Sequence, residues 1–326
     1  MQSSEFRIDT FVPSRSSSSA LLACCAFSFA LSLTAHAECR ALIISGDPGP
    51  DKNAAVRFND WTQRWTALLT DTYGFKKERV RVLSTPAASP NDGATQENCV
   101  KALGALARES SAEDQVVLIL IGHGYDTQKL SKLCLKGKDL SDIDAAKALA
   151  ELRARQLICI NTTAASSSWA KSLARAGRVI IVASGTEGLR SQTYFCEFML
   201  RALKAGNITL LDAFNRAALD TIHWYQNQFI SKDGTKVHGK EFQEIWKAMY
   251  PGQTMIAGGD QPQAANNNMA DTAAWLGRRV LPEVAGLEDN GDGELSSVYE
   301  DGKEPAPLPS KAGDGEVARK IVLGKP

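Results

Sequence analysis

The sequence has no excess of charge of either sign. It contains 37 Lys and Arg residues and 37 Asp and Glu residues, which gives a formal net charge of +0 at pH 7. A balanced chain has no global field to attract nucleic acid or an anionic membrane surface. We therefore expect no nucleic-acid partner.

The sequence also lacks an apolar run long enough to span a membrane comfortably. The best candidate, residues 20–33, is shorter than the roughly 20 residues that a transmembrane helix needs. Two arginines and a serine run precede it, and the small residues Ala35-His36-Ala37 follow it. This is the layout of a secretory signal peptide that is cut before Glu38. We expect a mature protein that is exported to the periplasm or secreted, with no membrane span.

Cysteines are few, and none has the spacing of metal ligands. Two of the seven lie in the predicted signal peptide, which leaves an odd number in an oxidising compartment. Their pairing stays open. Cys159 lies within an apolar run, and we expect it to be a small buried core residue.

The rest of the chain alternates apolar runs with helical stripes. The runs are typical of strands, and apolar residues at helical spacing separate them, first at Phe58–Tyr73 and last at Tyr194–Leu203. Strands that alternate with helices predict an α/β fold, a three-layer α/β/α sandwich on a mostly parallel sheet. The predicted strands include Ala41–Ser45, Arg79–Leu83, the run that leads to His123, the run that begins at Leu157, and Arg178–Ala183.

The pattern divides the chain into four parts. Residues 1–37 are the predicted signal peptide, and residues 38–205 form the α/β domain. Residues 206–260 are expected to be a helical extension of that domain. Residues 261–326 are rich in polar and acidic residues, and we expect them to form a tail over the domain or to be partly disordered.

Two consecutive predicted strands end in residues that suggest a site. The first, VVLILIGHG, presents His123 at its carboxyl end, and the second runs through Asn161 into TTAASSS. In parallel sheets, reacting groups gather beyond the carboxyl ends of neighbouring strands. A cysteine–histidine dyad would fit this place, but the second strand end has no cysteine.

These features together resemble the caspase-like clan of cysteine peptidases, nearest to the bacterial relatives of legumain, the peptidase C13 group. The resemblance spans residues 40–203, about half the chain. The matching segments are ALIISG, RVRVLS, VVLILIGHG, LKGKDLSDIDAAKAL, LICINTTAASSSWAKSL, RVIIVAS and FCEFMLRAL. In that family the strand-end histidine assists a cysteine at the tip of the next strand.

The resemblance implies that His123 corresponds to the histidine of the dyad, whereas no residue of this sequence corresponds to the cysteine. Counting from the strand places Thr163 at the nucleophile position, and anchoring on Ser166 as the motif serine places Ala164 there. A thiolate beside an imidazole is nucleophilic at neutral pH, whereas an alcohol needs a strong base and a well-placed oxyanion hole. Ser166 and Ser167 are alternative nucleophiles. The structural alternative is that these serines cap the N-terminus of the next helix. The free N–H groups of such a helix end can bind an anion.

We therefore expect a catalytically silent pseudopeptidase that needs no cofactor and acts as a binding or scaffolding protein. A peptide or protein ligand would occupy the former substrate cleft beside His123 and Thr163. The alternative is a C13-like hydrolase that uses His123 with a serine, a threonine or an unrecognised cysteine. A hydroxyl of Thr163, Ser166 or Ser167 within hydrogen-bond reach of His123 would favour the alternative.

An acidic loop near the C-terminus resembles a calcium-binding loop of the EF-hand type. Glu288 takes the first ligand position, and Asn290, Asp292 and the backbone of Glu294 supply further oxygens. The twelfth position, however, is Tyr299, where a bidentate glutamate is expected. The loop is thus a candidate calcium site, with an acidic surface turn as the alternative.

Overall fold

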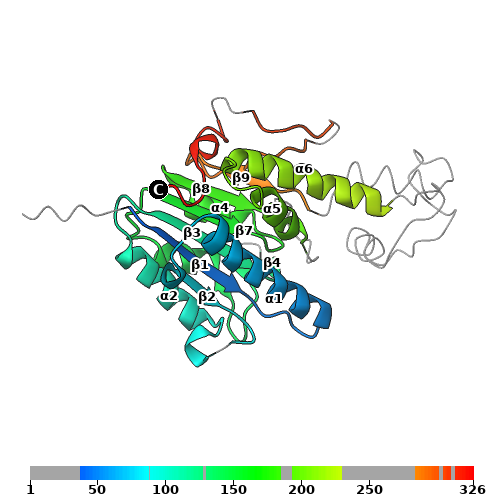
Figure 1. The fold of residues 1–326 in the computed structure, drawn as a ribbon. Helices are drawn as coiled ribbons and strands as arrows, with labels where there is room; N and C mark the ends of the chain where they lie inside the picture. The colour runs from blue at the N-terminus through cyan, green and yellow to red at the C-terminus, as the bar shows by residue number, and fades with distance from the viewer. Residues whose placement is uncertain are drawn as a thin grey trace, which may run out of the picture. The chain divides into compact units, whose positions relative to one another are not determined.

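The main sheet has six strands in the order β2-β1-β3-β7-β8-β9. All neighbouring strands are parallel except β8 and β9, which pair antiparallel. Figure 1 shows β3 between β1 and β7 in the middle of the sheet. The strands are β1 (Cys39–Ser45), β2 (Val80–Leu83), β3 (Gln115–Ile121), β7 (Gln156–Asn161), β8 (Arg178–Val182) and β9 (Gly286–Glu288).

This structure is a computed structural model of the full chain, and it describes seven stretches of it. They are residues 37–87, 89–127, 130–184, 193–229, 283–300, 304–309 and 313–326. All fall within the unit 35–326. The predicted signal peptide therefore lies outside the described residues up to residue 36. Residues 230–282, which include parts of the predicted helical extension 206–260 and of the predicted tail 261–326, also lie outside them.

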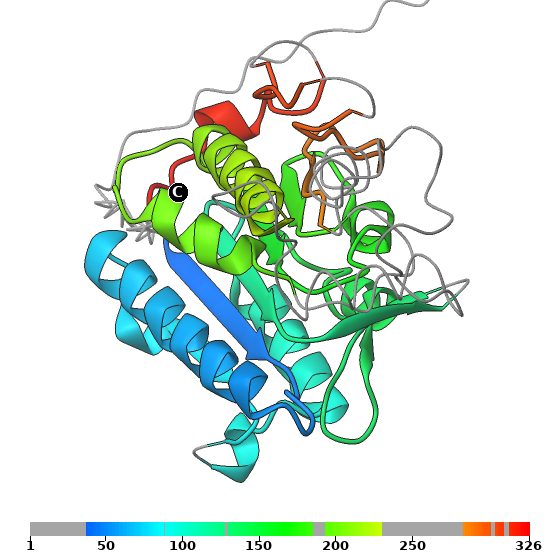
Figure 2. The same cartoon turned by 90° about the vertical axis from the view of Figure 1, so that its right-hand side faces the viewer.

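Helices cover both faces of the sheet. Alternate residues of β1 point to opposite sides, so that Ile43 packs with α1, α5 and α6, while Leu42 and Ile44 pack with α2, α3 and α4. Figure 2 shows α1, α5 and α6 together on one side of β1. The predicted three-layer α/β/α sandwich is thus confirmed. The helices are α1 (Lys52–Ala67), α2 (Gln96–Glu109), α3 (Asp142–Ala148), α4 (Ser168–Leu173), α5 (Phe195–Leu203) and α6 (Leu210–Phe229).

Caps decide where the helices begin. The first helix starts six residues before the predicted stripe, because the Asp51 carboxylate accepts the Asn53 N–H at 2.9 Å. The predicted capping box at Ser141 is present in α3. The predicted serine stands at the N-cap of α4 as Ser167, but its side chain makes no capping hydrogen bond. The neighbouring Ser168 hydroxyl instead donates to Asp142 at 2.9 Å.

A smaller antiparallel sheet follows β3 directly. It consists of β4 (Gly124–Thr127), β5 (Leu130–Leu133) and β6 (Leu140–Ser141), in that order. Gly124 pairs with Leu133 in this ladder. The residue after His123 therefore begins a hairpin that stands at the carboxyl edge of the main sheet.

The C-terminal segment takes part in the core, which the sequence analysis did not anticipate. Strand β9 adds to the sheet edge with Leu287 opposite Ile181. Leu287, Ile321 and Leu323 are all buried in the same cluster as α1, α5 and α6. A few apolar side chains spaced among acidic residues are enough to dock a segment whose average composition is polar.

Two further observations bear on the predicted class of protein. None of the helices in the described part of the chain combines the length and hydrophobicity that a membrane span requires. No disulfide joins any two of the five described cysteines, and Cys159 is buried as predicted.

Candidate functional site

The carboxyl ends of β3 and β7 meet, as the sequence predicts. Leu120 lies opposite Asn161 in the parallel ladder. One residue further, the Thr162 N–H and hydroxyl both donate to the Leu120 carbonyl, at 2.9 and 2.7 Å. His123 and Thr163 therefore leave the sheet at the same edge, from neighbouring strands.

His123 is half-buried against the start of α1. Its ring meets the Phe58 ring edge-on, with the centroids 5.1 Å apart. Burial lowers the pKa of His123 below its ordinary value, and the positive charge of Arg57 acts in the same direction. The Pro48 backbone and the nearby carboxylates of Asp51 and Asp47 oppose this shift without cancelling it. His123 is thus held as a neutral imidazole near pH 7, which can accept a proton or a hydrogen bond.

Thr163 lies at the nucleophile position, but its side chain is turned into the protein. The residue is 0% exposed, and its hydroxyl donates to the Asn161 carboxamide oxygen at 2.7 Å. The Thr163 N–H donates to the same oxygen at 3.0 Å. The Asn161 amide nitrogen is buried without an acceptor among the described residues. Ala164, the other candidate position, is 2% exposed and has no reacting atom.

The two candidate serines also lie apart from His123. The Ser166 side chain is buried, where its oxygen accepts the Ser184 N–H at 3.2 Å and its hydroxyl lies 3.4 Å from the Ser184 carbonyl. Ser167 is half-buried at the start of α4. In the described part of the chain, no hydroxyl of Thr163, Ser166 or Ser167 makes a hydrogen bond with His123.

The hairpin after His123 packs closely against the loop that follows β7 and carries Thr163 and Ala164. A Cβ atom added to Gly124 would lie 2.3 Å from the Ala164 carbonyl oxygen and 2.8 Å from the Thr163 hydroxyl oxygen. The Ser131 hydroxyl of β5 donates to the carbonyl of Ala165, whose φ is 51°. The loop backbone is therefore fixed by close contact with the hairpin on one side and by the sheet on the other.

Beside this loop lies a pocket of 410 Å³ that the hairpin and β3 share. His123, Gly124, Tyr125 and Cys134 line it. The Cys134 N–H donates to the His123 carbonyl at 2.9 Å, which extends the β4–β5 ladder by one pair. Directly opposite residues in an antiparallel pair present their side chains on the same face. A half-buried thiol therefore lies beside His123.

No sequence pattern indicated Cys134 at this site. Only the pairing of the hairpin strands brings it there, because Cys134 comes 11 positions after His123 and no motif links them. The Tyr125 hydroxyl, which donates to Asp139 at 2.7 Å, is a further polar group at the pocket that pattern alone did not indicate.

A second pocket, of 350 Å³, is lined by residues of α1, of α6 and of α5 with Tyr194 just before it. Its lining includes Arg57, whose guanidinium lies 5.7 Å from the Trp61 ring centroid and 5.3 Å from that of Tyr194. Cation–π contacts of this kind hold a guanidinium in place while leaving its charge effective. The positive charge of Arg57 also acts to lower the pKa of His123.

The candidate calcium loop folds as a tight turn in which acidic side chains accept backbone N–H groups. Glu288 is fully buried and accepts the Gly291 N–H at 2.5 Å. Asn290 accepts from Asp292 at 2.8 Å, and Asp292 accepts from Glu294 at 2.7 Å. Glu294 itself lies 3.8 Å from the Lys171 ammonium. Among the described residues, no group of three or more His, Cys, Asp or Glu side chains is arranged to hold a metal ion.

Comparison with known proteins finds matches only among solved structures. No family model and no curated protein matches the chain. One similar solved structure is a structural-genomics protein of Geobacter sulfurreducens, with 15% identity and a TM-score of 0.38, covering 56% of this chain and 89% of that one. Another is described as pro-sf-caspase-1, with 11% identity and a TM-score of 0.42, covering 63% of this chain and 88% of that one. The fold class rests on strand order and layers rather than on these neighbours.

Proposed function

We propose that the chain is an exported, caspase/legumain-like pseudopeptidase that binds a peptide or protein segment beside His123 and does not cleave it. The observation that carries the proposal is the direction of the Thr163 hydroxyl, which donates to Asn161 from a fully buried position. A nucleophile must reach both its base and the substrate. The export part rests on the signal-peptide pattern of residues 1–37.

The pocket retains what a binding site needs. His123 offers a neutral imidazole, Tyr125 an aromatic ring, and Arg57 a cation in the adjoining pocket. Ligand sites commonly combine apolar walls with a few fixed polar groups of this kind. A peptide with a carbonyl or carboxylate near the Arg57 guanidinium would match this distribution.

A direct test is selection of binders from a displayed peptide library with the protein that begins at Glu38. We expect enriched peptides whose affinity falls at least about tenfold in His123→Ala, the loss that removal of one good polar contact produces. His223→Ala is the matched control, because His223 is exposed on α6 and lines neither pocket. Peptides that bind both variants equally would place the ligand elsewhere.

The second candidate function is a thiol-dependent hydrolase, and the presence of Cys134 beside His123 favours it. Here a neutral His123 would take the proton of the Cys134 thiol and return it to the leaving group. The thiol would come from the hairpin rather than from the end of β7.

Turnover of fluorogenic peptides, including ones with Asn or Asp at the cleaved position, separates the two functions. We expect no turnover above buffer for the wild-type protein, because no hydroxyl of the β7 loop bonds to His123. Turnover that disappears in Cys134→Ser but persists in Cys39→Ser, a half-buried thiol of β1, would establish the hydrolase. Turnover lost only in His123→Ala and Thr163→Ala would identify a hydroxyl nucleophile. Activity that appears in Thr163→Cys or Ala164→Cys would show an otherwise intact site that lacks its thiol.

A further inference from the structure

The first residue of the predicted mature chain is fixed at the amino end of the sheet. The Glu38 N–H donates to an Asp114 carboxylate oxygen at 2.9 Å, and the Glu38 carbonyl accepts the Gln115 N–H at 2.9 Å. The Glu38 carboxylate pairs with Arg40 at 2.8 Å and with two further cations just before β2, Lys76 at 3.2 Å and Arg79 at 3.0 Å. Ala37, immediately before it, is exposed.

The Asp114 carboxylate is buried and is arranged to accept hydrogen bonds from a positively charged group. The residue is 2% exposed, and its second carboxylate oxygen accepts Arg40 Nε at 3.0 Å. Ser111 donates to both oxygens, through its N–H at 3.0 Å and its hydroxyl at 2.7 Å. Burial acts to raise the pKa of Asp114, but the hydrogen bonds from Glu38, Ser111 and Arg40 outweigh it, so the pKa is lowered. The carboxylate is charged at neutral pH.

We propose that Glu38 is the mature N-terminus and that Asp114 is the binding site for its α-ammonium group. An export peptidase would add water across the Ala37–Glu38 bond, leaving a carboxylate on Ala37 and an amine on Glu38 that takes up a proton. The nitrogen already lies 2.9 Å from Asp114, so cleavage replaces a hydrogen bond between a neutral amide and the charged carboxylate with an ion pair, without moving the chain. The added positive charge on the donor strengthens the attraction to the carboxylate.

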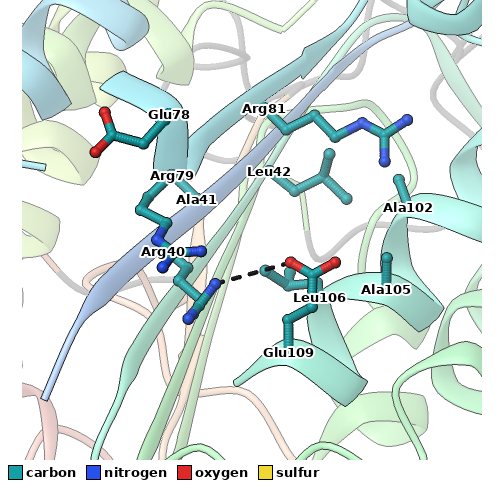
Figure 3. A pocket seen from close by; sticks show the side chains of 10 residues that line it. All are labelled: Arg40, Ala41, Leu42, Glu78, Arg79, Arg81, Ala102, Ala105, Leu106 and Glu109. Atoms are coloured by element: carbon teal, nitrogen blue, oxygen red, sulfur yellow. Dashed lines mark ion pairs between the residues drawn. The ribbon is translucent and has the colours of Figure 1, made fainter. Parts of the chain in front are cut away.

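The charges around Glu38 balance before the ammonium is added. Three acidic groups face three basic groups there when the nitrogen is a neutral amide. Figure 3 shows Arg40 reaching across to Glu109 of α2, at 3.8 Å, with Arg79 beside it. Arg40 is already divided between three carboxylates. The groups are Glu38, Glu109 and Asp114 against Arg40, Lys76 and Arg79.

The proposal has a defined pH signature. An α-amino group has a pKa of about 7.7–8.0 in an unfolded chain, and the Asp114 carboxylate would raise it in the folded protein. The extra stability is then fully present below about pH 7.7 and disappears as the pH rises through the raised folded pKa.

The test compares two proteins that differ only at the N-terminus, one beginning at Glu38 and one extended by Met-Ala37. Both keep an N–H on Glu38, but only the protein that begins at Glu38 places the α-ammonium charge on the nitrogen beside Asp114. At pH 6.5 we expect the protein that begins at Glu38 to melt about 2–4 °C higher, with the difference lost above pH 10 and in the Asp114→Asn background. Equal melting at pH 6.5, or a difference that survives Asp114→Asn, would overturn the proposal.

Two measurements keep the test decisive if Asp114→Asn fails to fold. The pKa of the α-amino group, from the pH dependence of its acylation, is expected about one unit or more above the unfolded value. An ordinary or lowered pKa contradicts the ion pair. The intact mass of the protein exported from the full-length chain is expected to correspond to a start at Glu38, and any other start refutes the processing step. Neither readout depends on ligand binding.

Discussion

Replacing Asp289 with alanine is expected to lower the free energy of unfolding by about 3 kcal/mol or more. Asp289 is 1% exposed, and its carboxylate accepts three backbone N–H groups of the last segment of the chain. The donors are Gly315 at 2.9 Å, Val317 at 3.0 Å and Ala318 at 2.7 Å. Each buried donor that loses its acceptor costs about 1–3 kcal/mol. Chemical denaturation with urea measures the change directly.

The matched control is Asp292→Ala, in the same acidic loop. Asp292 is exposed and accepts only the Glu294 N–H, so we expect a change of about 0.5 kcal/mol. The pair also tests calcium, because Asp292 is a predicted calcium ligand and Asp289 is not. If calcium stabilises the loop, a chelator lowers the melting temperature of the wild-type protein and has no effect on Asp292→Ala. We expect the chelator to change neither, because Asp289 ties the loop to the C-terminal segment through direct hydrogen bonds.

The sequence predicts the centre of the fold well because periodicity and burial agree there. The four central runs are apolar throughout, as parallel strands covered on both faces must be, and their ends identify the edge where His123 and Thr163 meet. The orientation of Thr163 was not predictable. It depends on a bond to Asn161, two residues away, that competes with any approach to His123.

Features that depend on contacts between residues far apart in the sequence could not be predicted either. Strand β9 has only three residues and lies in an acidic segment, so it is too short to show the apolar periodicity by which a strand is predicted. The N-terminus of α5 is capped by Glu283, whose carboxylate accepts the N–H groups of Tyr194 and Phe195 at 2.7 and 2.8 Å from 88 or more residues away. Cys134 reaches the His123 pocket through the hairpin register alone. Each of these contacts is set by tertiary packing, which local patterns do not encode.

Gly124→Ala is expected to destabilise the protein by about 3 kcal/mol, the upper end of the usual cost of overpacking. The φ angle of Gly124 lies outside the left-handed region, so the backbone conformation itself would accept alanine. The obstacle is space, since the new Cβ would meet the Ala164 carbonyl oxygen at 2.3 Å. A backbone atom cannot rotate away as a flexible side chain can, so the hairpin and the β7 loop must separate. Urea denaturation gives the loss of stability.

The control is Gly104→Ala in α2, where the added Cβ would meet only the tip of the Arg108 side chain at 3.2 Å. A glycine inside a helix costs about 0.5–1 kcal/mol relative to alanine, so this variant is expected to be neutral or slightly more stable. Because Gly124 lines the pocket and contacts the loop, its replacement should also abolish binding of the selected peptides, which Gly104→Ala should leave unchanged. A stable Gly124→Ala protein that still binds them would mean that the hairpin does not fix the loop. The glycine after His123 would then have no structural role at this site.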